Sequence, residues 1–529
     1  MSVTPDVWPD TPSLLTIVRE RARTTADRPF LVEVGGRTVS FAELEAEATA
    51  WAAGLHRLGV CRGDVVCSMQ ATSASGIALW LGACALGAID AGIAVSYRGG
   101  LLRELLEKAT VLVVDGDLLD RVTPLLPELA DLRAIVLTGT ASVAGDARIT
   151  TAAEVLAPGS NPDLVMADPQ PWDIGCLTHT SGTTGPSKGV LLPWGHLYAF
   201  ATALFDPATL GPDEVFYSPM PMNHVAQRVQ TYLMGLTGGR VVLRNAFSAS
   251  EYWSDIRRHG ATLTNVSVGA RILWNAQPRP DDAENPLRRA LMSPLLPEYQ
   301  EFGERFGLEV QTMFGSTEVG LPIVSDGPAP YARTSGRVNS RFPHFEVRLV
   351  DEHDRPVQVG TPGELVVRTA VPWTLNRGYL GRPEASLEAW RNGWFHTGDM
   401  LVVDEDGWYS FADRVTDSIR RRGENVSSWE VERVIGTQPD VGEAAVVGVE
   451  SSTWGEQDVL AVVVPTVDSS LDPTDLVRRL GEALPSFMVP RYVRVVDALP
   501  RSEATLRVQK GVLRAHGIDE DTWDREASR

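Results

Sequence analysis

Cysteine and positive charge are both scarce in this chain. Its 529 residues include 4 cysteines, which stand far apart and lack metal-ligand spacing. This pattern argues against a disulfide framework and indicates a reducing compartment. Lysine and arginine number 48 against 68 aspartates and glutamates, which gives a formal net charge of −20. Because attraction to phosphate needs a basic face, no nucleic-acid partner and no anionic-membrane partner is expected.

The chain also has no evident targeting segment and no long apolar run. Residues 1–12 are acidic and proline-rich, so no signal peptide is expected. The most apolar stretch, 77–95, contains Asp90 and three glycines. A buried helix that runs into a strand fits this stretch better than a membrane span. We therefore expect a cytoplasmic protein.

Alternating helix and strand patterns predict a layered α/β fold for most of the chain. Ser40 and Glu43 form a capping box, and the apolar residues that follow recur at steps of three and four, as in an amphipathic helix. Strands are predicted at the apolar runs 65–67, 111–114 and 134–137, and helices at 73–88 and 118–129. This alternation favours a body with much parallel sheet.

The pattern changes after about residue 414. A short helix, two apolar strands, a second helix and a last strand are predicted at 428–435, 444–449, 459–464, 474–484 and 492–496. A chain of 529 residues is too long for one compact core. We therefore predict a large layered α/β N-terminal domain, 1–414, and a small α+β C-terminal domain, 415–529.

The segment Thr178–Gly189 has the composition of a phosphate-binding loop. It contains six hydroxyl side chains, three glycines and Lys188, and it follows an apolar run. Glycines let backbone N–H groups approach an anion, hydroxyls add donors and lysine adds charge. A flexible surface loop is the alternative, which this ordered run beside a strand disfavours. The segment is not a Walker loop, because Gly-Lys-Ser/Thr is absent, and no Gly-x-Gly-x-x-Gly opens a helix.

Thr180–Gly189 closely resembles the signature loop of the acyl-adenylate-forming superfamily, which comprises acyl-CoA synthetases, adenylation domains and luciferases. Further motifs that resemble the same superfamily follow in order, at Phe314–Glu318, Gly363–Arg368, Trp394–Asp399 and Arg422–Glu432. Five ordered motifs are far more specific than one. Among these enzymes, the sequence most resembles the acyl-CoA ligases of the carnitine/crotonobetaine type.

This resemblance implies a two-step ligase reaction that uses ATP, Mg²⁺ and coenzyme A. A small carboxylic acid would attack the α-phosphorus of ATP, giving acyl-AMP and pyrophosphate. The C-terminal domain would then rotate, and a thiol would displace AMP. Positioning and charge neutralisation carry most of phosphoryl transfer, which fits motifs that contain donors and cations but no obvious nucleophile.

The resemblance also implies roles for single residues. Glu318 would ligate magnesium, which prefers oxygen ligands, and Thr317 would contact the α-phosphate. Asp399 would accept from both ribose hydroxyls, with Arg414 beside it. His224 matches a position next to the substrate carboxylate, although a lone histidine is often structural. The remaining residues implied in nucleotide binding, catalysis or coenzyme A binding are Thr180, Ser181, Gly182, Thr183, Thr184, Gly185, Lys188, Arg422 and Gly423.

Three positions depart from the superfamily pattern. Arg507 stands where a catalytic lysine is usual, and its planar fork differs from a point ammonium; Lys510 is the alternative cation. Thr416 occupies the hinge position, and Ser293-Pro294-Leu295 replaces a glycine-containing loop beside adenine. We therefore expect first-step activity that is low or adapted to an unusual acid.

Alternative functions remain open at this point. The acceptor would be an amine, a carrier-protein thiol or another nucleophile in one alternative, and nitrite would be activated to diazotise an aromatic amine in another. A non-catalytic nucleotide-binding relative is the third, which the intact Thr180–Gly189, Glu318 and Asp399 disfavour. The polar pocket candidates Asn223, Gln227, Asn265 and Ser267 favour a small or functionalised acid. Homodimers are common in the superfamily, so the resemblance implies a possible homodimer.

Overall fold

The computed structural model describes residues 11–139, 146–159, 161, 163–180, 188–267, 269–414, 419–421, 424–426, 428–451, 457–467, 469–484, 486, 488–502 and 507–527. The chain divides into two compact units. Unit 1 contains the described residues of Met1–Ser181, Ser187–Val347 and Val367–Phe395, and unit 2 contains those of Arg348–Val366 and His396–Arg529. The division passes through strands β18 (Phe345–Val350), β19 (Gly363–Thr369) and β20 (Phe395–Val403).

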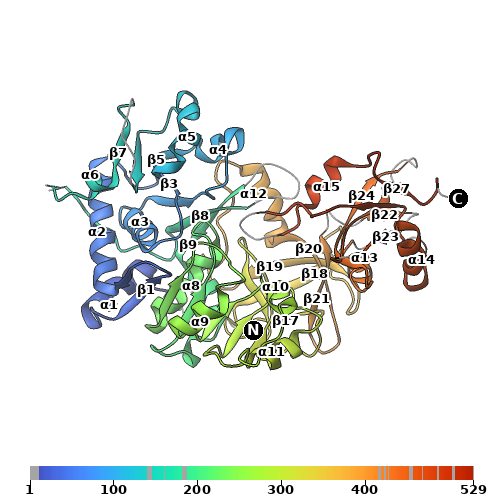
Figure 1. Ribbon diagram of the computed structural model, residues 1–529. Coiled ribbons are helices and arrows are strands. Elements are labelled where there is room, and N and C mark those ends of the chain that lie inside the picture. Colours follow the sequence, from blue (N-terminus) through green and yellow to red (C-terminus); the bar gives the residue numbers. More distant parts are fainter. Residues whose placement is uncertain are drawn as a thin grey trace. The chain divides into compact units, whose positions relative to one another are not determined.

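Two mainly parallel sheets form the body of unit 1 (Figure 1). The first has the order β14 (Glu309–Gln311), β13 (Arg289–Leu291), β12 (Leu263–Asn265), β10 (Val215–Ser218), β11 (Arg240–Leu243), β1 (Pro29–Glu33), β2 (Thr38–Ser40). The second has the order β7 (Ile149–Thr151), β6 (Ala134–Thr138), β5 (Ala109–Asp115), β3 (Val65–Met69), β4 (Ile89–Gly92), β8 (Ile174–Thr180), β9 (Lys188–Pro193). Only the pairs β1–β2 and β8–β9 are antiparallel among these described strands.

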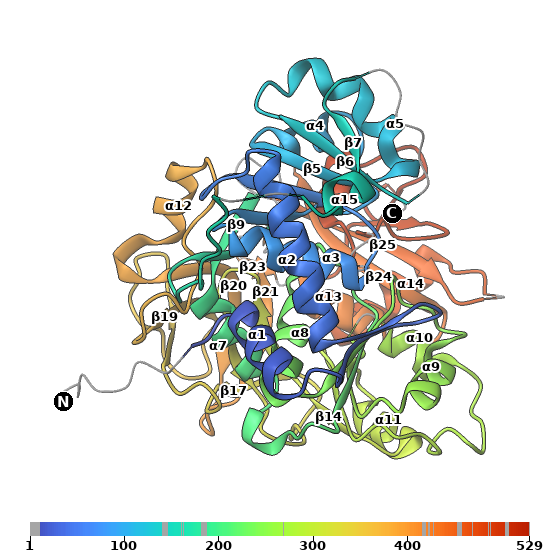
Figure 2. The same ribbon diagram turned by 90° about the vertical axis from the view of Figure 1, so that its left-hand side faces the viewer.

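Helices cover both faces of both sheets. A central core joins residues of the two sheets to α1 (Leu14–Thr24), α2 (Phe41–Arg57), α3 (Ala74–Ala85), α7 (Trp194–Leu204) and α8 (Val225–Thr237); Figure 2 shows α1, α2 and α3 along the side that faces the viewer. The outer face of the second sheet packs on α4 (Gly99–Leu106) and α5 (Leu119–Val122). The outer face of the first sheet packs on α9 (Tyr252–His259), α10 (Ala270–Asn275) and α11 (Tyr299–Phe306).

Strand β5 shows why the sheets need cover on two sides. Val111 and Val113 contribute to the central core, whereas Leu112 and Val114 contribute to the core on the opposite face. Side chains alternate between the faces of a strand, so an apolar run without alternation is buried on both. The predicted layered α/β class is confirmed.

Most elements predicted in unit 1 occur where the sequence placed them. Ser40 and Glu43 form the capping box of α2, and α3 begins after its N-cap Ser73. The predicted helix at 118–129 is wrong in part, because the segment consists of η1 (Gly116–Leu118), the four-residue α5 and η2 (Thr123–Glu128). Pro124 and Pro127 lack the N–H that a continuous α-helix requires.

Unit 2 contains the small α+β fold that was predicted. Its sheet has the order β24 (Val441–Glu450), β25 (Gln457–Pro465), β26 (Tyr492–Val495), β27 (Trp523–Asp524), and α13 (Ser428–Ile435) and α14 (Pro473–Ala483) pack on it. The other elements of this unit are β21 (Tyr409–Arg414), β22 (Ile419–Arg421), β23 (Glu424–Val426) and α15 (Lys510–His516). The domain boundary near residue 414 stays a prediction.

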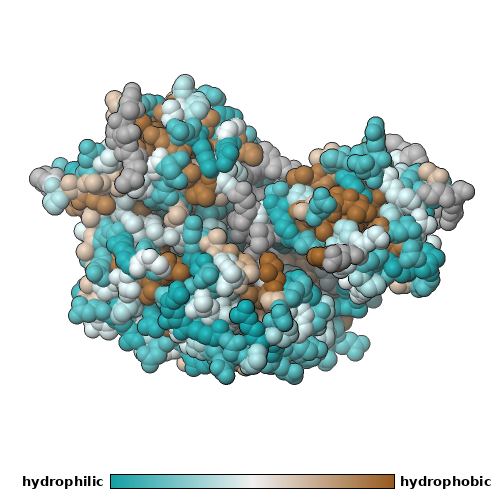
Figure 3. Space-filling view, in the orientation of Figure 1, coloured by the Kyte–Doolittle hydropathy of each residue, from teal (hydrophilic) through white to brown (hydrophobic). Residues whose placement is uncertain are grey.

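No helix among the described residues has the length and apolar character needed to cross a membrane. On the face that Figure 3 shows, hydrophilic residues predominate and hydrophobic residues form separate patches.

Candidate nucleotide and acyl site

Thr317 and Glu318 lie at the tip of a tight hairpin in unit 1. Strand β15 (Met313–Ser316) pairs antiparallel with β16 (Gly320–Val324), and Ser316 faces Gly320. The Glu318 N–H donates to Ser316 Oγ at 3.2 Å. A Cβ atom on Gly315 would lie 2.1 Å from the Gly320 carbonyl oxygen, so the close approach of the two strands requires glycine. The Gly-Ser-Thr-Glu order therefore fixes where the Glu318 carboxylate stands.

Two side chains from distant segments hold the carbonyl groups of this tip. His196 on α7 is fully buried; its Nε2 lies 3.0 Å from the Thr317 carbonyl oxygen and its Nδ1 3.1 Å from that of Thr374. Asn376 Nδ2 donates to the Glu318 carbonyl oxygen at 2.8 Å. His196 and Asn376 thus hold the backbone of the hairpin tip, and we call these two residues the clamp. Neither of them contacts the Glu318 carboxylate in these bonds.

The protonation of His196 limits what it can hold. Burial lowers the pKa of His196 to about 4, although its two carbonyl partners oppose that shift. At neutral pH the ring is therefore uncharged and carries one N–H, whereas it faces two acceptors. Only one of the two carbonyl groups receives a hydrogen bond at a time.

Substitution of His196 separates its two contacts. His196→Gln keeps an amide donor near the Nε2 position, facing Thr317, and His196→Asn keeps one near Nδ1, facing Thr374. We expect His196→Asn to lower kcat for AMP formation about 10- to 100-fold, because it would displace Thr317, the residue predicted to contact the α-phosphate, and His196→Gln to retain most of the rate. Both variants should lose about 1–3 kcal/mol of unfolding free energy. Steady-state kinetics with urea unfolding measures both quantities, and equal kcat values would contradict a positioning role.

Tyr379 lies between strand β9 and the hairpin. Lys188 Nζ lies 5.0 Å from the centroid of the Tyr379 ring, and the Tyr379 hydroxyl donates to Glu318 Oε1 at a long 3.4 Å. Burial and the nearby Glu318 carboxylate raise the pKa of Tyr379, so the hydroxyl stays protonated. The Leu380 N–H donates to the Gly189 carbonyl oxygen at 2.8 Å. Lys188 and Glu318 are far apart in sequence, and they thus contact the ring and the hydroxyl of the same tyrosine.

Glu318 fits the role of a magnesium ligand. No cation among the described residues forms an ion pair with its half-buried carboxylate. The described part of the chain also holds no cluster of three or more metal-ligating side chains. Mg²⁺ is commonly bound by one or two carboxylates together with substrate phosphates, without a cage of protein ligands. A single carboxylate without an ion-pair partner among the described residues matches that pattern.

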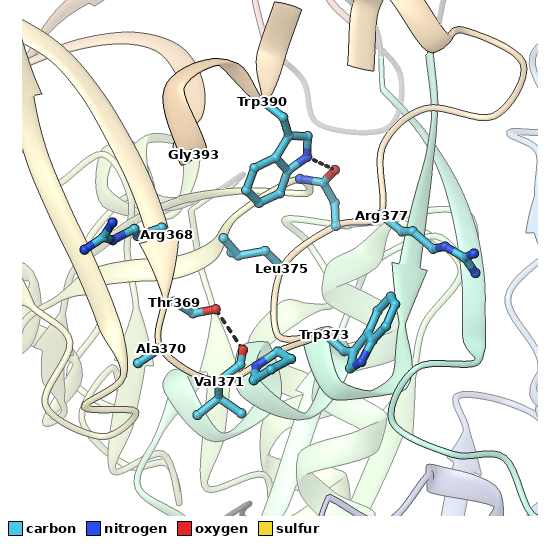
Figure 4. A pocket seen from close by; sticks show the side chains of 11 residues that line it. Arg368, Thr369, Ala370, Val371, Trp373, Leu375, Arg377, Trp390 and Gly393 are labelled. Carbon is cyan, nitrogen blue, oxygen red and sulfur yellow. Dashed lines mark hydrogen bonds between the residues drawn. The ribbon is translucent and has the colours of Figure 1, made fainter. Parts of the chain in front are cut away.

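Asn376 also lines a hollow of about 490 Å³, together with residues 368–373, Leu375, Arg377, Trp390 and Gly393. Figure 4 shows Arg368 and Arg377 extending away from each other. Asn376 Oδ1 accepts from Trp390 Nε1 at 3.2 Å and from the Gly378 N–H at 2.8 Å. These two donors fix the amide orientation, so Nδ2 is the group that reaches Glu318.

Polar side chains gather at the carboxyl ends of β10 and β12, where parallel sheets usually bind ligands. Asn265 Oδ1 accepts from the Ser267 N–H at 3.0 Å, and Ser267 Oγ accepts from the Ser293 N–H at 2.9 Å. Ser293 Oγ donates to the Met313 carbonyl oxygen at 2.6 Å, and the Ser293–Pro294 peptide is cis. The loop that replaces the usual adenine-side sequence is thus bonded to the strand that leads to Glu318.

His224 is the N-cap of α8, beside the same edge. Its Nδ1 accepts from the Ala226 N–H at 3.1 Å. When the ring is neutral, this bond places its proton on Nε2. The histidine has a structural role at the helix start, and this role is compatible with the predicted one.

Asp399 belongs to unit 2. Its position is fixed by contacts between Glu364 and the segment that precedes Asp399. Glu364 accepts from the Gly398 N–H at 3.0 Å and contacts His396 Nδ1 at 3.0 Å. The Asp399 N–H donates to Thr397 Oγ1 at 3.1 Å, and the Asp399 side chain is largely buried. The backbone of Arg414 pairs with that of Asp399 across β20 and β21.

The predicted C-terminal cations have different settings within unit 2. Arg507 is exposed, and its carbonyl oxygen accepts from the Ser502 N–H at 2.8 Å. Lys510 begins α15 and lies 2.8 Å from Glu432 Oε1 and 2.6 Å from Ser428 Oγ. These contacts disfavour Lys510 as the reacting cation. The predicted residues outside the described part of the chain are Ser181, Gly182, Thr183, Thr184, Gly185, Thr416, Arg422, Gly423 and the Arg414 side chain.

The layered α/β fold and the hairpin carboxylate are compatible with an adenylating enzyme, and comparison with known proteins identifies the family. The family described as AMP-binding enzyme matches residues 18–380, and its C-terminal domain matches 430–505. The chain belongs to this acyl-adenylate-forming family and is an enzyme of the acyl-CoA synthetase type.

Relatives with known names support the same assignment. Crotonobetaine/carnitine–CoA ligase of Escherichia coli O8 (strain IAI1) is 30% identical over 484 residues, covering 88% of this chain and 90% of the relative. The medium/long-chain-fatty-acid–CoA ligase FadD17 of Mycobacterium marinum (strain ATCC BAA-535 / M) is 35% identical over 373 residues, covering 69% and 72%. The fold resembles that of o-succinylbenzoate coenzyme A synthetase from Bacillus subtilis, with a TM-score of 0.82 at 22% identity over 97% and 99% of the chains.

Proposed function

We propose that this enzyme activates a small carboxylic acid with Mg-ATP to form acyl-AMP and then transfers the acyl group to coenzyme A. The proposal rests mainly on one observation: Lys188 contacts the ring of Tyr379, and Glu318 contacts its hydroxyl. An ATP–magnesium complex requires a cation for the phosphates, here Lys188, and a carboxylate for the metal, here Glu318. The names of the ligases quoted above support coenzyme A as the acceptor.

Each predicted residue has a task in this proposal. Thr180 and Lys188 bind phosphate together with Ser181, Gly182, Thr183, Thr184 and Gly185, and Glu318 holds the magnesium ion while Thr317 contacts the α-phosphate. His224 donates to the acid carboxylate, and Asp399 and Arg414 bind the ribose. Arg507 supplies charge near the reacting groups, and Arg422 and Gly423 receive coenzyme A. Bound Mg²⁺ supplies neutralisation of phosphate charge. The proposal also places the enzyme in the cytoplasm, where ATP and coenzyme A are available, and includes a homodimer, as is common in the superfamily.

The test is AMP release from Mg-ATP across short, aromatic and functionalised acids, with nitrite included, each with and without coenzyme A. Acid-dependent AMP together with an acyl-thioester product is the expected result. AMP that forms equally well without coenzyme A would assign a different acceptor. Nucleotide-dependent thermal stabilisation without AMP from any acid would overturn the catalytic proposal and favour a binding protein.

A further inference from the structure

Tyr379 lies in a segment that extends the second sheet beyond β9. Val190 and Tyr379 form an antiparallel bridge, and the Leu380 N–H donates to the Gly189 carbonyl oxygen at 2.8 Å. Residues opposite each other in an antiparallel pair face the same side of the sheet, and so do residues two positions further along each strand. Lys188 stands two positions before Val190, so its side chain is the diagonal neighbour of the Tyr379 ring. The 5.0 Å from Lys188 Nζ to the ring centroid follows from this pairing.

The same segment is bonded to the hairpin that carries Glu318. Asn376 donates to the Glu318 carbonyl oxygen from Nδ2 at 2.8 Å and from its own N–H at 3.3 Å. Three residues further on, the Tyr379 N–H donates to Ser386 Oγ at 2.9 Å. The backbone of Tyr379 is therefore held relative to β9 on one side and relative to the Glu318 backbone on the other.

The Tyr379 hydroxyl distinguishes the two oxygens of the Glu318 carboxylate. It donates to Oε1 at 3.4 Å, since an ionised carboxylate only accepts hydrogen bonds. Oε2 is the oxygen that this bond leaves for a metal ion. Carboxylates that bind metals are themselves oriented by hydrogen bonds, and loss of such a partner typically costs about 10- to 100-fold in metal affinity or activity. The ring of the same tyrosine attracts the Lys188 ammonium through its electron-rich face.

We propose that Tyr379 is a positioning residue for acyl-AMP formation, whose hydroxyl turns Glu318 Oε2 toward the magnesium ion and whose ring holds the Lys188 ammonium in place for the phosphates. This inference rests on the proposed function and adds a residue to the same site. The hydroxyl and the ring act on different partners, so substitution separates them. Tyr379→Phe removes the hydroxyl and keeps the ring, whereas Tyr379→Leu removes both.

The test uses Mn²⁺, which accepts oxygen ligands as Mg²⁺ does, together with α,β-methylene-ATP, which cannot form AMP. Electron paramagnetic resonance measures the dissociation constant of Mn²⁺, and titration calorimetry at saturating Mn²⁺ measures that of the nucleotide analogue. Tyr379→Phe should raise the constant for Mn²⁺ about 10-fold, the low end of the usual range because the bond is long, and leave that of the analogue within about twofold. Tyr379→Leu should also weaken binding of the analogue about 3- to 10-fold.

Tyr299→Phe is the matched control, because it removes a hydroxyl that donates to the Ala329 carbonyl oxygen at 2.6 Å, away from this contact. It should keep both wild-type constants. In assays of AMP release, Tyr379→Phe should raise the Mg²⁺ concentration at half-maximal rate by the same factor of about 10, and Tyr299→Phe should leave it unchanged.

A double-variant cycle with Glu318→Gln separates positioning from a general effect on packing. If the hydroxyl acts through the Glu318 charge, adding Tyr379→Phe to Glu318→Gln should change Mn²⁺ binding by less than about twofold. A further loss of about 10-fold in the double variant, wild-type Mn²⁺ binding in Tyr379→Phe, or no Mn²⁺ binding by the wild-type complex would overturn the inference. The Phe variant and the cycle decide even if Tyr379→Leu does not fold. If no acid yields AMP, the proposed function fails, and the Mn²⁺ titrations still decide the role of Tyr379.

Discussion

Glu318→Gln is expected to lower the rate of AMP formation by a factor of about 10² to 10³. The change removes one negative charge and keeps the shape of the side chain. The Glu318 carbonyl remains bonded to Asn376, and the Thr317 carbonyl remains next to His196 Nε2, so the hairpin should keep its place. The loss therefore reports the missing charge toward magnesium. AMP release measured over a range of Mg²⁺ concentrations should show a weaker dependence on the metal in the variant.

Glu301→Gln, on the exposed side of α11, is the matched control for this change and should behave as wild type. Unfolding free energy should change by no more than about 0.5 kcal/mol in either variant. A Glu318→Gln enzyme with wild-type rates at every Mg²⁺ concentration would remove Glu318 from the metal site.

Arg228→Met is expected to destabilise unit 1 by about 3–5 kcal/mol, because it leaves a buried carboxylate without its partner. Arg228 Nη2 lies 2.5 Å from Asp90 Oδ2, and both side chains are 1% exposed. The guanidinium also lies over the Trp80 ring, 4.7 Å from its centroid. Burial raises the pKa of Asp90, and Arg228 opposes that rise. Without Arg228, no positive charge in this pair compensates for the cost of burying the Asp90 carboxylate.

Urea unfolding followed by circular dichroism measures this effect, and the double variant Asp90→Val/Arg228→Met completes the cycle. The double variant should recover much of the loss, since a well-packed apolar pair often replaces a buried ion pair without penalty. Arg478→Met is the control, because Arg478 pairs with Asp475 on an exposed helix face and should lose less than about 1 kcal/mol. A double variant as unstable as Arg228→Met would show that the arginine acts through packing instead of charge.

The parts of the site that are local in sequence could be predicted from it. The motif at Phe314–Glu318 and the apolar run that leads to Thr180 consist of residues that stand next to one another, so they could be recognised in the sequence, whereas the hairpin that β15 and β16 form was not predicted. The layered α/β class follows from alternating patterns for the same reason. The prolines at 124 and 127 carried the signal that the helix predicted at 118–129 would break.

The clamp around the hairpin could not be predicted, because its members are ordinary residues far apart in the chain. His196, Asn376 and Tyr379 belong to no local pattern, and only the packing of α7 and the segment 374–380 against β15 and β16 brings them to the tip. Lys510 was a plausible cation in the sequence, and its partners Ser428 and Glu432 come from a separate helix. In both cases tertiary contacts decide the role.

The long span of the clamp has a consequence for how the enzyme is made. The residue His196 is 121 positions from Thr317 and 178 from Thr374. A ribosome adding 5–20 residues per second needs roughly 9 to 36 s to travel from the histidine to the second of these partners. Until Thr317 is added, the ring that ends fully buried lacks both carbonyl partners, and until Thr374 is added it still lacks the second. The catalytic hairpin is therefore completed late in synthesis, after the sheets around it can form.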